Sequence, residues 1–92
     1  MYYTYVIKSI EKDGLYTGST SNLKRRMLEH NKGLNLSTKN GKPWHVIYYE
    51  ACMNEKDAKR REYYLKTTQG KKMLKRRIIE YWKVEWSKDL VK

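Results

Sequence analysis

The chain has 92 residues, enough for one small domain, and 39% of them are hydrophobic. It has no long apolar run and a single cysteine, Cys52, which excludes a membrane-spanning helix, an internal disulfide and a zinc site built on cysteines. The 21 lysines and arginines against 10 acidic residues give a net charge of +11, which favours a nucleic acid as partner over a membrane surface or a merely solvating role.

The first predicted elements are two strands joined by a tight turn. Residues 2–10 are rich in tyrosine, threonine, valine and isoleucine, which favour strands, and residues 15–19 form the returning strand. Between them, Asp13-Gly14 is typical of a two-residue type I′ hairpin turn. The N-terminal run resembles neither a secretion signal nor a transit peptide, so we expect a cytoplasmic protein.

The turn decides which side chains share a face of this hairpin. A two-residue turn places Glu11 opposite Tyr16, so Tyr16 lies on the same face as Tyr5. A loop one residue longer or shorter would move Tyr16 to the other face, because side chains alternate along a strand. The hairpin is therefore expected to present two tyrosines on one face.

A short helix is predicted over residues 23–31, with Ser21 or Asn22 as its N-cap and Gly33 beyond its end. Its inward line mixes apolar and charged or titratable residues, namely Leu23, Arg26, Met27 and His30. The outer face is expected to carry Lys24, Arg25 and Glu29. Residues 32–42 follow as a mobile, polar loop that could lie along a phosphate backbone.

The second half of the chain is predicted to hold one strand and two helices. Residues 44–51 form the third strand, which we expect to be central because it carries no acid before Glu50. A helix over residues 54–67 begins with the capping pair Asn54 and Asp57 and is ended by Gln69-Gly70. A last helix over residues 71–84 leads into a tryptophan-bearing tail.

The predicted order of elements is ββαβαα, which indicates an α+β fold with a small three-stranded, largely antiparallel sheet flanked by helices. The sequence shows neither a repeat nor a second domain. We expect one domain over residues 1–84 and a C-terminal tail over residues 85–92.

One acidic residue stands out in the helix over residues 54–67. Ala58, Glu62 and Leu65 follow the spacing of a buried helical line, so a carboxylate interrupts an apolar stripe. An ionised carboxylate in such a place needs a cation or a hydrogen-bond donor beside it. A packing role is the common explanation for any one such residue, but three elements here each place a polar functional group on an inward line, which random surface placement rarely does.

These motifs, in this order, resemble the GIY-YIG nuclease domain. Tyr3-Thr4-Tyr5 stands for the first motif and Tyr16-Thr17-Gly18 for the second, and the likeness continues through residues 22–31, Thr38, Pro43-Trp44 and residues 58–66. It covers about residues 2–80 and is greatest to the small standalone bacterial members of the family. Tyr3 stands where the family motif has its first glycine.

The resemblance implies a metal-dependent DNA endonuclease of the GIY-YIG type, with a role in DNA repair, recombination or exchange. Its catalytic residues would be Tyr5, Tyr16, Arg26, His30 and Glu62, with Arg25 as the rival for the arginine. Tyr5 would be the general base, Arg26 would bind the scissile phosphate, and Glu62 would hold one Mg²⁺ or Mn²⁺. No small-molecule cofactor is expected, single-stranded or branched DNA is the favoured substrate, and a protein partner would supply specificity.

The residues expected to contact nucleic acid are mainly basic. They are Gly18, which would allow close approach, together with Lys8, Lys24, Arg25, Thr38, Lys39, Lys42 and Lys66. The alternative is a non-catalytic module that binds single-stranded DNA or RNA by stacking bases on tyrosine and tryptophan. Glu62 separates the two hypotheses, because a pure binder gains nothing from an acid beside phosphate. A third reading, a scaffold for acidic protein partners, predicts no dependence on a divalent metal.

Overall fold

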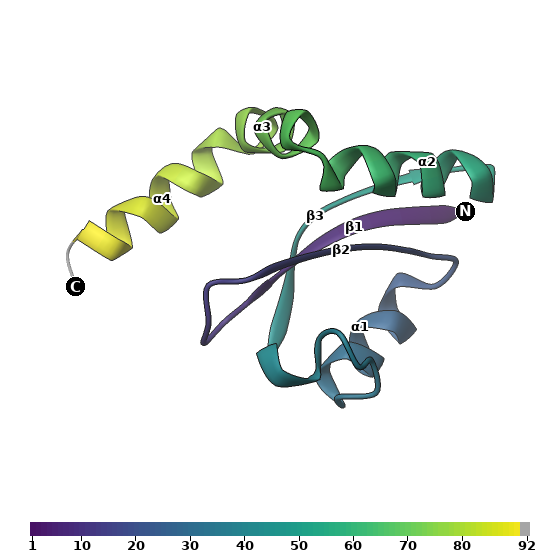
Figure 1. Cartoon of the computed structure of the whole chain (residues 1–92), viewed down its shortest axis with the longest axis horizontal. Helices are drawn as coiled ribbons and strands as arrows, with labels where there is room; N and C mark the ends of the chain where they lie inside the picture. Colours follow the sequence, from purple (N-terminus) through teal and green to yellow (C-terminus); the bar gives the residue numbers. More distant parts are fainter. Residues whose placement is uncertain (91–92) are drawn as a thin grey trace.

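The structure, a computed structural model, describes the backbone of residues 1–90 and the side chains of residues 1–85. Its elements in chain order are β1 (Tyr2–Ser9), β2 (Leu15–Thr20), α1 (Leu23–Asn31), the short 3-10 helix η1 (Lys39–Gly41), β3 (Trp44–Cys52), α2 (Glu55–Lys66), α3 (Thr68–Arg77) and α4 (Ile79–Leu90). The helix α1 lies on one side of the sheet, and α2 and α3 lie on the other (Figure 1). The predicted α+β fold, an antiparallel three-stranded sheet flanked by helices, is confirmed.

The central strand is β1, so the prediction that residues 44–51 form the central strand was wrong. The strand order is β2-β1-β3, with both neighbours antiparallel to β1. Residues 4–7 of β1 are all buried, whereas β3 is an edge strand whose residues after Trp44 are half-buried or exposed. A central strand must be apolar on both faces, and in this sheet β1 meets that demand.

The hairpin is longer than predicted, but its faces are as expected. Residues 10–14 connect β1 to β2, and the Ser9 N–H closes this loop by donating to the Gly14 carbonyl at 3.0 Å. Tyr16 therefore pairs with Ile7 instead of Glu11, four positions earlier along β1. Because a shift by an even number keeps the alternation of side chains, Tyr16 still shares a face with Tyr5. The predicted two-residue turn was wrong, and the predicted pair of tyrosines on one face is confirmed.

The first two α-helices, α1 and α2, begin where the sequence predicts. Asn22 caps α1 by accepting a hydrogen bond from the Arg25 N–H, and Asn54 caps α2 by accepting one from the Lys56 N–H. Gly33, just beyond α1, has φ of +77°, a conformation that favours glycine. These caps fix the direction in which each helix crosses the sheet.

The end of the chain differs from the prediction of one helix over residues 71–84. Two helices, α3 and α4, occupy residues 68–77 and 79–90 and meet at Ile78. Gln69-Gly70 lies inside α3, because α2 already ends at Lys66. Thr67 follows α2, and its hydroxyl accepts from the Gly70 N–H at 3.0 Å and caps α3. The helix α4 runs through the expected boundary at residue 84, and residues 91–92 of the predicted tail lie outside the described residues.

Each face of the sheet has its own core. On the side of α1, the buried residues Tyr5, Ile7 and Trp44 pack together. On the side of α2 and α3, Val6 packs with Leu65 and Leu74. Among the described residues, no helix combines the length and the apolar character needed to cross a membrane.

Candidate active site

A chain of buried hydrogen bonds runs beneath α1. The Tyr5 hydroxyl lies 2.8 Å from Nε2 of His30, and Nδ1 of His30 lies 2.7 Å from the Thr38 hydroxyl. All three side chains are almost completely buried. The Trp44 indole donates to the Thr38 carbonyl at 2.8 Å, which ties the loop over residues 32–42 to the sheet. Thr38 therefore anchors this loop to the site, whereas the residues on either side of Thr38 are exposed.

The protonation of this chain follows from its burial. Burial lowers the pKa of His30, the charge of Arg26 lowers it further, and Glu29 opposes the change only partly. His30 is thus neutral at pH 7 and has one donor and one acceptor nitrogen. Two arrangements satisfy both contacts. In one, the Tyr5 hydroxyl donates to Nε2 and Nδ1–H donates to the Thr38 hydroxyl oxygen; in the other, the Thr38 hydroxyl donates to Nδ1 and Nε2–H donates to the Tyr5 oxygen.

Gly18 makes room for the Tyr5 side chain. The two residues are partners across β1 and β2, and a Cβ added to Gly18 would lie 2.6 Å from the Tyr5 hydroxyl oxygen. The ring of Tyr16 lies beside the ring of His30, with centroids 5.2 Å apart in an edge-on arrangement. The glycine of the second motif therefore lets Tyr5 lie across β2, next to Tyr16.

Arg26, Tyr16 and Glu62 each influence the pKa of the Tyr5 hydroxyl. Burial raises the pKa of Tyr5 to about 12, Arg26 opposes the rise through hydrogen bonding and positive charge, and the charges of Tyr16 and Glu62 add to it. These effects show that Arg26, Tyr16 and Glu62 all lie within electrostatic range of this hydroxyl. In this state Tyr5 keeps its proton at neutral pH.

Arg26 is the arginine directed at the site. Its side chain is 28% exposed, and its guanidinium donates to Glu29 at 3.0 Å. Burial alone would lower the pKa of Arg26, but its hydrogen bonds to Glu29 and Tyr5 outweigh burial and raise it. Arg25, the rival residue, is 61% exposed on the outer side of α1, 3.9 Å from Glu29. Of the two arginines, only Arg26 interacts with Tyr5.

Glu62 lies on the inward line of α2, as its spacing suggests. Ser19 of β2 donates to its Oε1 at 2.7 Å, and Lys66 donates to its Oε2 at 2.8 Å. Burial would raise the pKa of Glu62, but the hydrogen bonds from Lys66 and Ser19 and the charges of Lys66 and Lys59 outweigh it and lower the pKa. Glu62 is therefore an ionised carboxylate, 19% exposed, at the edge of the site.

The donor set at Glu62 fits a divalent cation that needs few protein ligands. Among the residues that the structure describes, no three His, Cys, Asp or Glu side chains cluster as metal ligands. A single ionised carboxylate is enough for Mg²⁺, which usually keeps several waters and binds substrate phosphates. Carboxylate oxygen is a hard ligand that suits Mg²⁺ or Mn²⁺, whereas sulfur and imidazole ligands favour zinc.

The residues expected to contact nucleic acid fall into two groups. Exposed ones are Lys24, Arg25, Lys39, Lys42 and Lys66. The others are covered: Lys8 is 18% exposed and lies 3.9 Å from Glu85, Thr38 is buried in the hydrogen-bond chain, and Gly18 is buried under Tyr5. Thr38 and Gly18 thus lie behind the predicted catalytic residues His30 and Tyr5.

Two residues of the site escaped the sequence analysis. Ser19 holds Glu62 from the neighbouring strand, and Glu29, expected on the outer face of α1, is half-buried and holds Arg26. The spacing of three between Arg26 and Glu29 could have indicated an ion pair. Nothing local marks Ser19, because its partner lies 43 positions away in the sequence.

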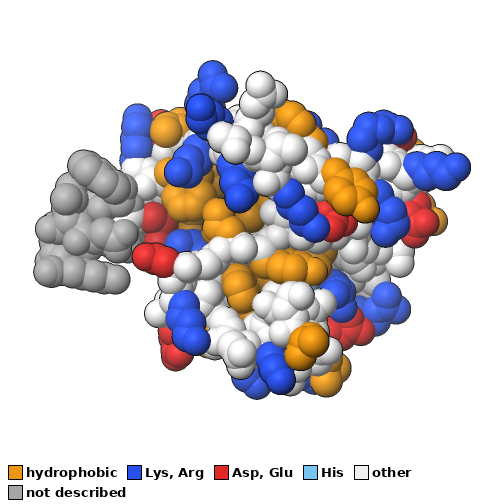
Figure 2. Space-filling model, in the orientation of Figure 1, with side chains coloured by type: hydrophobic (Ala, Val, Ile, Leu, Met, Phe, Trp, Pro, Cys, Tyr) orange, Lys and Arg blue, Asp and Glu red, His pale blue; other side chains and the backbone are white. Residues whose placement is uncertain are grey.

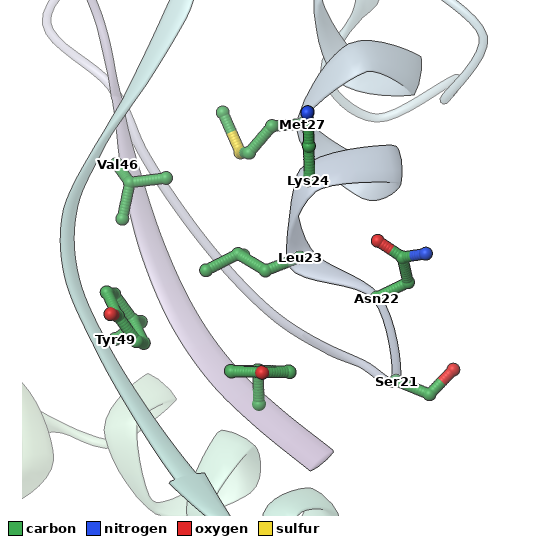
Figure 3. Close-up of a pocket in the computed structure, with 8 residues that line it drawn as sticks. Ser21, Asn22, Leu23, Lys24, Met27, Val46 and Tyr49 are labelled. Carbon is green, nitrogen blue, oxygen red and sulfur yellow. The ribbon is translucent and has the colours of Figure 1, made fainter. Parts of the chain in front are cut away.

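An open pocket lies between α1 and β3, on the α1 side of the sheet. It has a volume of about 610 Å³, and Leu23 and Met27 point from α1 toward Val46 and Tyr49 of β3 (Figure 3). Lys24 lies at its rim, and Tyr3 packs near Tyr49 with ring centroids 6.1 Å apart. None of the five predicted catalytic residues lines this pocket.

Comparison with known proteins gives matches over most of the chain. A family model described as the GIY-YIG catalytic domain matches residues 1–77. A UPF0213 protein of Clostridium perfringens is 39% identical over 67 residues, 72% of this chain and 71% of the relative. A UPF0213 protein of Staphylococcus haemolyticus is 36% identical over 75 residues, 80% of this chain and 90% of the relative. No solved structure matches the chain significantly.

Proposed function

Because this chain belongs to the GIY-YIG family, whose catalytic domain defines a nuclease superfamily, we propose that it is a metal-dependent endonuclease that hydrolyses phosphodiester bonds of DNA. The observation that carries the proposal is Glu62, an ionised acid within electrostatic range of Tyr5 on a chain with a net charge of +11. A surface that only binds phosphate has no use for such an acid.

Arg26 binds the scissile phosphate in this proposal. Its planar guanidinium can donate two parallel hydrogen bonds to phosphate oxygens, and Glu29 holds it in place from the same helix. Because Arg26 is half-buried between α1 and the sheet, its side chain loses little freedom when phosphate binds. It also brings a permanent positive charge to the oxygens on which negative charge develops.

Tyr5 acts as the general base, with His30 and Tyr16 beside it. When neutral His30 carries its proton on Nδ1, the Nε2 atom 2.8 Å from the Tyr5 hydroxyl can accept a proton, which provides a relay away from the attacking water. Since the pKa of Tyr5 is about 12 in the free chain, the role requires that binding of the substrate and a cation lower it. Tyr16 is partly exposed, and its ring packs edge-on against the ring of His30.

Glu62 would hold one Mg²⁺ or Mn²⁺. When bound, the ion would supply positive charge that stabilises the phosphate oxygens during hydrolysis. Ser19 and Lys66 keep the carboxylate ionised and fix both of its oxygens.

The favoured substrate is single-stranded or branched DNA, and a protein partner supplies the sequence or structure specificity. A domain of this size can contact only a short stretch of nucleic acid. The exposed cations Lys24, Arg25, Lys39, Lys42 and Lys66 are proposed to contact the phosphate backbone, with Lys8 in support. Such contacts position the strand without reading its sequence.

The test compares cleavage of labelled single-stranded, duplex and branched DNA with Mg²⁺ or with a chelator. We expect Glu62→Gln and Arg26→Ala each to lower the cleavage rate by about a hundredfold or more, because each removes charge stabilisation of the transition state. Glu62→Gln should keep or increase affinity for DNA measured in chelator, since it removes an acid beside phosphate.

The matched control is Glu50→Gln, because Glu50 forms a comparably exposed ion pair with Arg61 away from the site. This variant should cleave like the wild-type chain. Equal cleavage by wild type, Glu62→Gln and Arg26→Ala would point to a contaminating nuclease and refute the proposal. Metal-independent binding without any cleavage would instead favour the non-catalytic binding module.

A further inference from the structure

A second pocket lies on the α2 and α3 side of the sheet, with a volume of about 460 Å³. Its floor is the hydrophobic core itself, because Val6, Leu65 and Leu74 line it although each is almost completely buried. Leu15 of β2, 45% exposed, extends the apolar floor toward the sheet edge. Figure 2 shows hydrophobic side chains at the bottom of such a hollow beside Lys and Arg side chains. An apolar floor of this kind favours a flat, poorly hydrated group.

The rim of this pocket is basic. Lys66 from α2 and Lys71 and Lys75 from α3 all line it, and no acidic residue is among its lining residues. Lys71 and Lys75 are exposed, so both side chains can turn toward a ligand at low cost. A ligand that matches both floor and rim has a flat apolar part and a negative charge.

Trp82 of α4 forms the remaining wall. The Lys75 ammonium lies 6.0 Å from the centre of its ring, so the aromatic wall and the basic rim are in contact. The indole N–H of Trp82 is buried and has no hydrogen-bond acceptor among the residues whose side chains are described. Because this N–H is buried, the wall offers a ligand the aromatic ring of Trp82 and not a hydrogen-bond donor.

The pocket shares two residues with the candidate active site and its surroundings. Tyr16 and Lys66 line it, and Lys66 is the residue that donates to Glu62 at 2.8 Å. A ligand in the pocket would therefore contact the partly exposed tyrosine of the site and the lysine that holds the acid.

We propose that this pocket binds one unpaired nucleotide of the DNA strand next to the scissile phosphate, an inference that rests on the proposed nuclease function. The base lies on the apolar floor against Trp82, and its phosphate faces Lys71 and Lys75. Trp82 lies beyond residue 77, where the match to the family model ends, so this wall belongs to the chain's own C-terminal helix. A base in a duplex is stacked and paired, so the pocket selects single-stranded or frayed DNA.

The pocket between α1 and β3 is the competing aromatic surface, and it fits this role less well. It contains the rings of Tyr3 and Tyr49, but Lys24 is the one basic residue in its lining, and no predicted catalytic residue borders it. Tyr49 is 55% exposed and therefore provides a control for unspecific stacking on any surface tyrosine.

The experiment measures equilibrium binding in chelator, so that it does not depend on cleavage. The probes are a labelled oligothymidine and an abasic strand of the same length and charge. We expect the wild-type chain to prefer the strand with bases, and Trp82→Leu to weaken binding of that strand by about tenfold while the abasic strand is unaffected. Trp82→Phe keeps an aromatic ring of smaller area, so it should lose only part of the preference.

Variants of Lys75 and of Tyr49, which lines the pocket between α1 and β3, complete the experiment. Lys75→Gln should weaken both strands equally, because a phosphate contact does not depend on the base. Tyr49→Leu should keep the full preference for bases. If Trp82→Leu is unfolded by circular dichroism, Trp82→Phe and Lys75→Gln decide the question. An unchanged preference in Trp82→Phe together with wild-type binding by Lys75→Gln would then overturn the inference.

The outcome for the pocket is separate from the outcome for the nuclease. Base-dependent binding that is lost in Trp82→Leu, on a chain that never cleaves DNA, would support the pocket and refute the catalytic function. Cleavage by a Trp82→Leu variant with unchanged affinity, rate and cut positions would refute the pocket alone. Loss of the base preference in Tyr49→Leu but not in Trp82→Leu would assign the base to the α1 and β3 pocket.

Discussion

At the scale of single residues, the site depends on a histidine that the fold keeps neutral. His30 has a partner at each ring nitrogen and is fully buried. A proton added to its ring would therefore create a buried positive charge that water cannot solvate. Its pKa in the folded chain therefore lies below the ordinary value of 6.5. Below that pH the unfolded chain binds a proton that the folded chain does not, which links protonation to unfolding.

The first prediction concerns acid sensitivity. The stability contributed by neutral His30 is complete above pH 6.5 and is lost as the pH falls below it, by at most about 1.4 kcal/mol per pH unit. We expect His30→Asn to be less stable at neutral pH but to lose less of its remaining stability on acidification. Urea unfolding between about pH 7 and pH 5 measures both effects.

His45 is the control, because it is the only other histidine of the chain and is exposed on β3. His45→Gln should keep the wild-type dependence on pH. Because the pKa of Glu62 is lowered, the stability that its ionised form contributes is lost only below the ordinary value of 4.5, outside the range from about pH 7 to pH 5. A steep acid dependence that persists in His30→Asn and disappears in His45→Gln would contradict this account.

The sequence located the candidate catalytic residues better than it explained how they are held. Alternation along a strand and helical spacing placed Tyr5, Tyr16 and Glu62 on inward lines, because both periods are local properties. The supports could not be predicted in the same way. Ser19 meets Glu62, and Thr38 meets His30, only after separate elements have packed together.

At the scale of elements, the junction of α2 and α3 shows how a glycine can be misinterpreted. Gly70 was expected to break a helix, but it lies in the first turn of α3, which Thr67 caps. A Cβ on Gly70 would collide with the Tyr64 carbonyl oxygen and would lie 2.8 Å from the Leu65 Cα. The residue is small so that two helices can approach, a requirement of tertiary contact that the local sequence does not reveal.

The second prediction follows from this contact. Replacing glycine by alanine inside a helix normally stabilises it by about 0.5–1 kcal/mol, because glycine is conformationally freer. Gly70→Ala should instead destabilise the chain by about 1–3 kcal/mol, since the new methyl group forces α3 away from α2. The free energy of unfolding in urea gives the sign directly.

Gln69→Ala tests whether the effect comes from the helix itself, because Gln69 is the exposed neighbour in the same turn of α3. This change should alter stability by no more than about 0.5 kcal/mol. A Gly70→Ala chain that is as stable as the wild type would show that the two helices do not approach as closely as described.

At the scale of the whole molecule, charge is the property that the sequence predicted without reference to the fold. The net charge of +11 favours a polyanionic partner, but composition does not say which cations contact it. The exposed loop residues Lys39 and Lys42 lie next to the buried Thr38 that bonds to His30, which makes them candidates for backbone contacts near the site.

The third prediction concerns the salt dependence of binding to single-stranded DNA. Each phosphate contact contributes about −0.7 to the slope of log affinity against log salt. Lys39→Gln combined with Lys42→Gln should therefore reduce the slope by about 1.4 if both residues contact phosphates. Fluorescence anisotropy in chelator at several salt concentrations provides the slopes.

A double variant with the same loss of charge separates position from net charge. Lys56→Gln with Arg60→Gln removes two exposed cations near the start of α2. If the loop residues contact the strand, this second variant should change the slope much less. Equal slopes in the two variants would mean that total charge, and not the loop, governs binding.

The order of strands was the largest error at this scale, and its cause is physical. The run from Val46 to Tyr49 is as apolar as β1, so composition could not show which strand has two neighbours. That choice depends on long connections, which bring β3 beside β1 across the whole length of α1 and the following loop.

A central β1 has a consequence for how the sheet forms during synthesis. Of the three strands, β1 is made first and needs partners on both of its edges, and the second partner ends only at Cys52. A chain that stops earlier keeps one edge of β1 unpaired and lacks Glu62 as well. The last strand is therefore synthesised before the acid, and a chain interrupted before Cys52 has an exposed strand edge, which favours aggregation, and no Glu62.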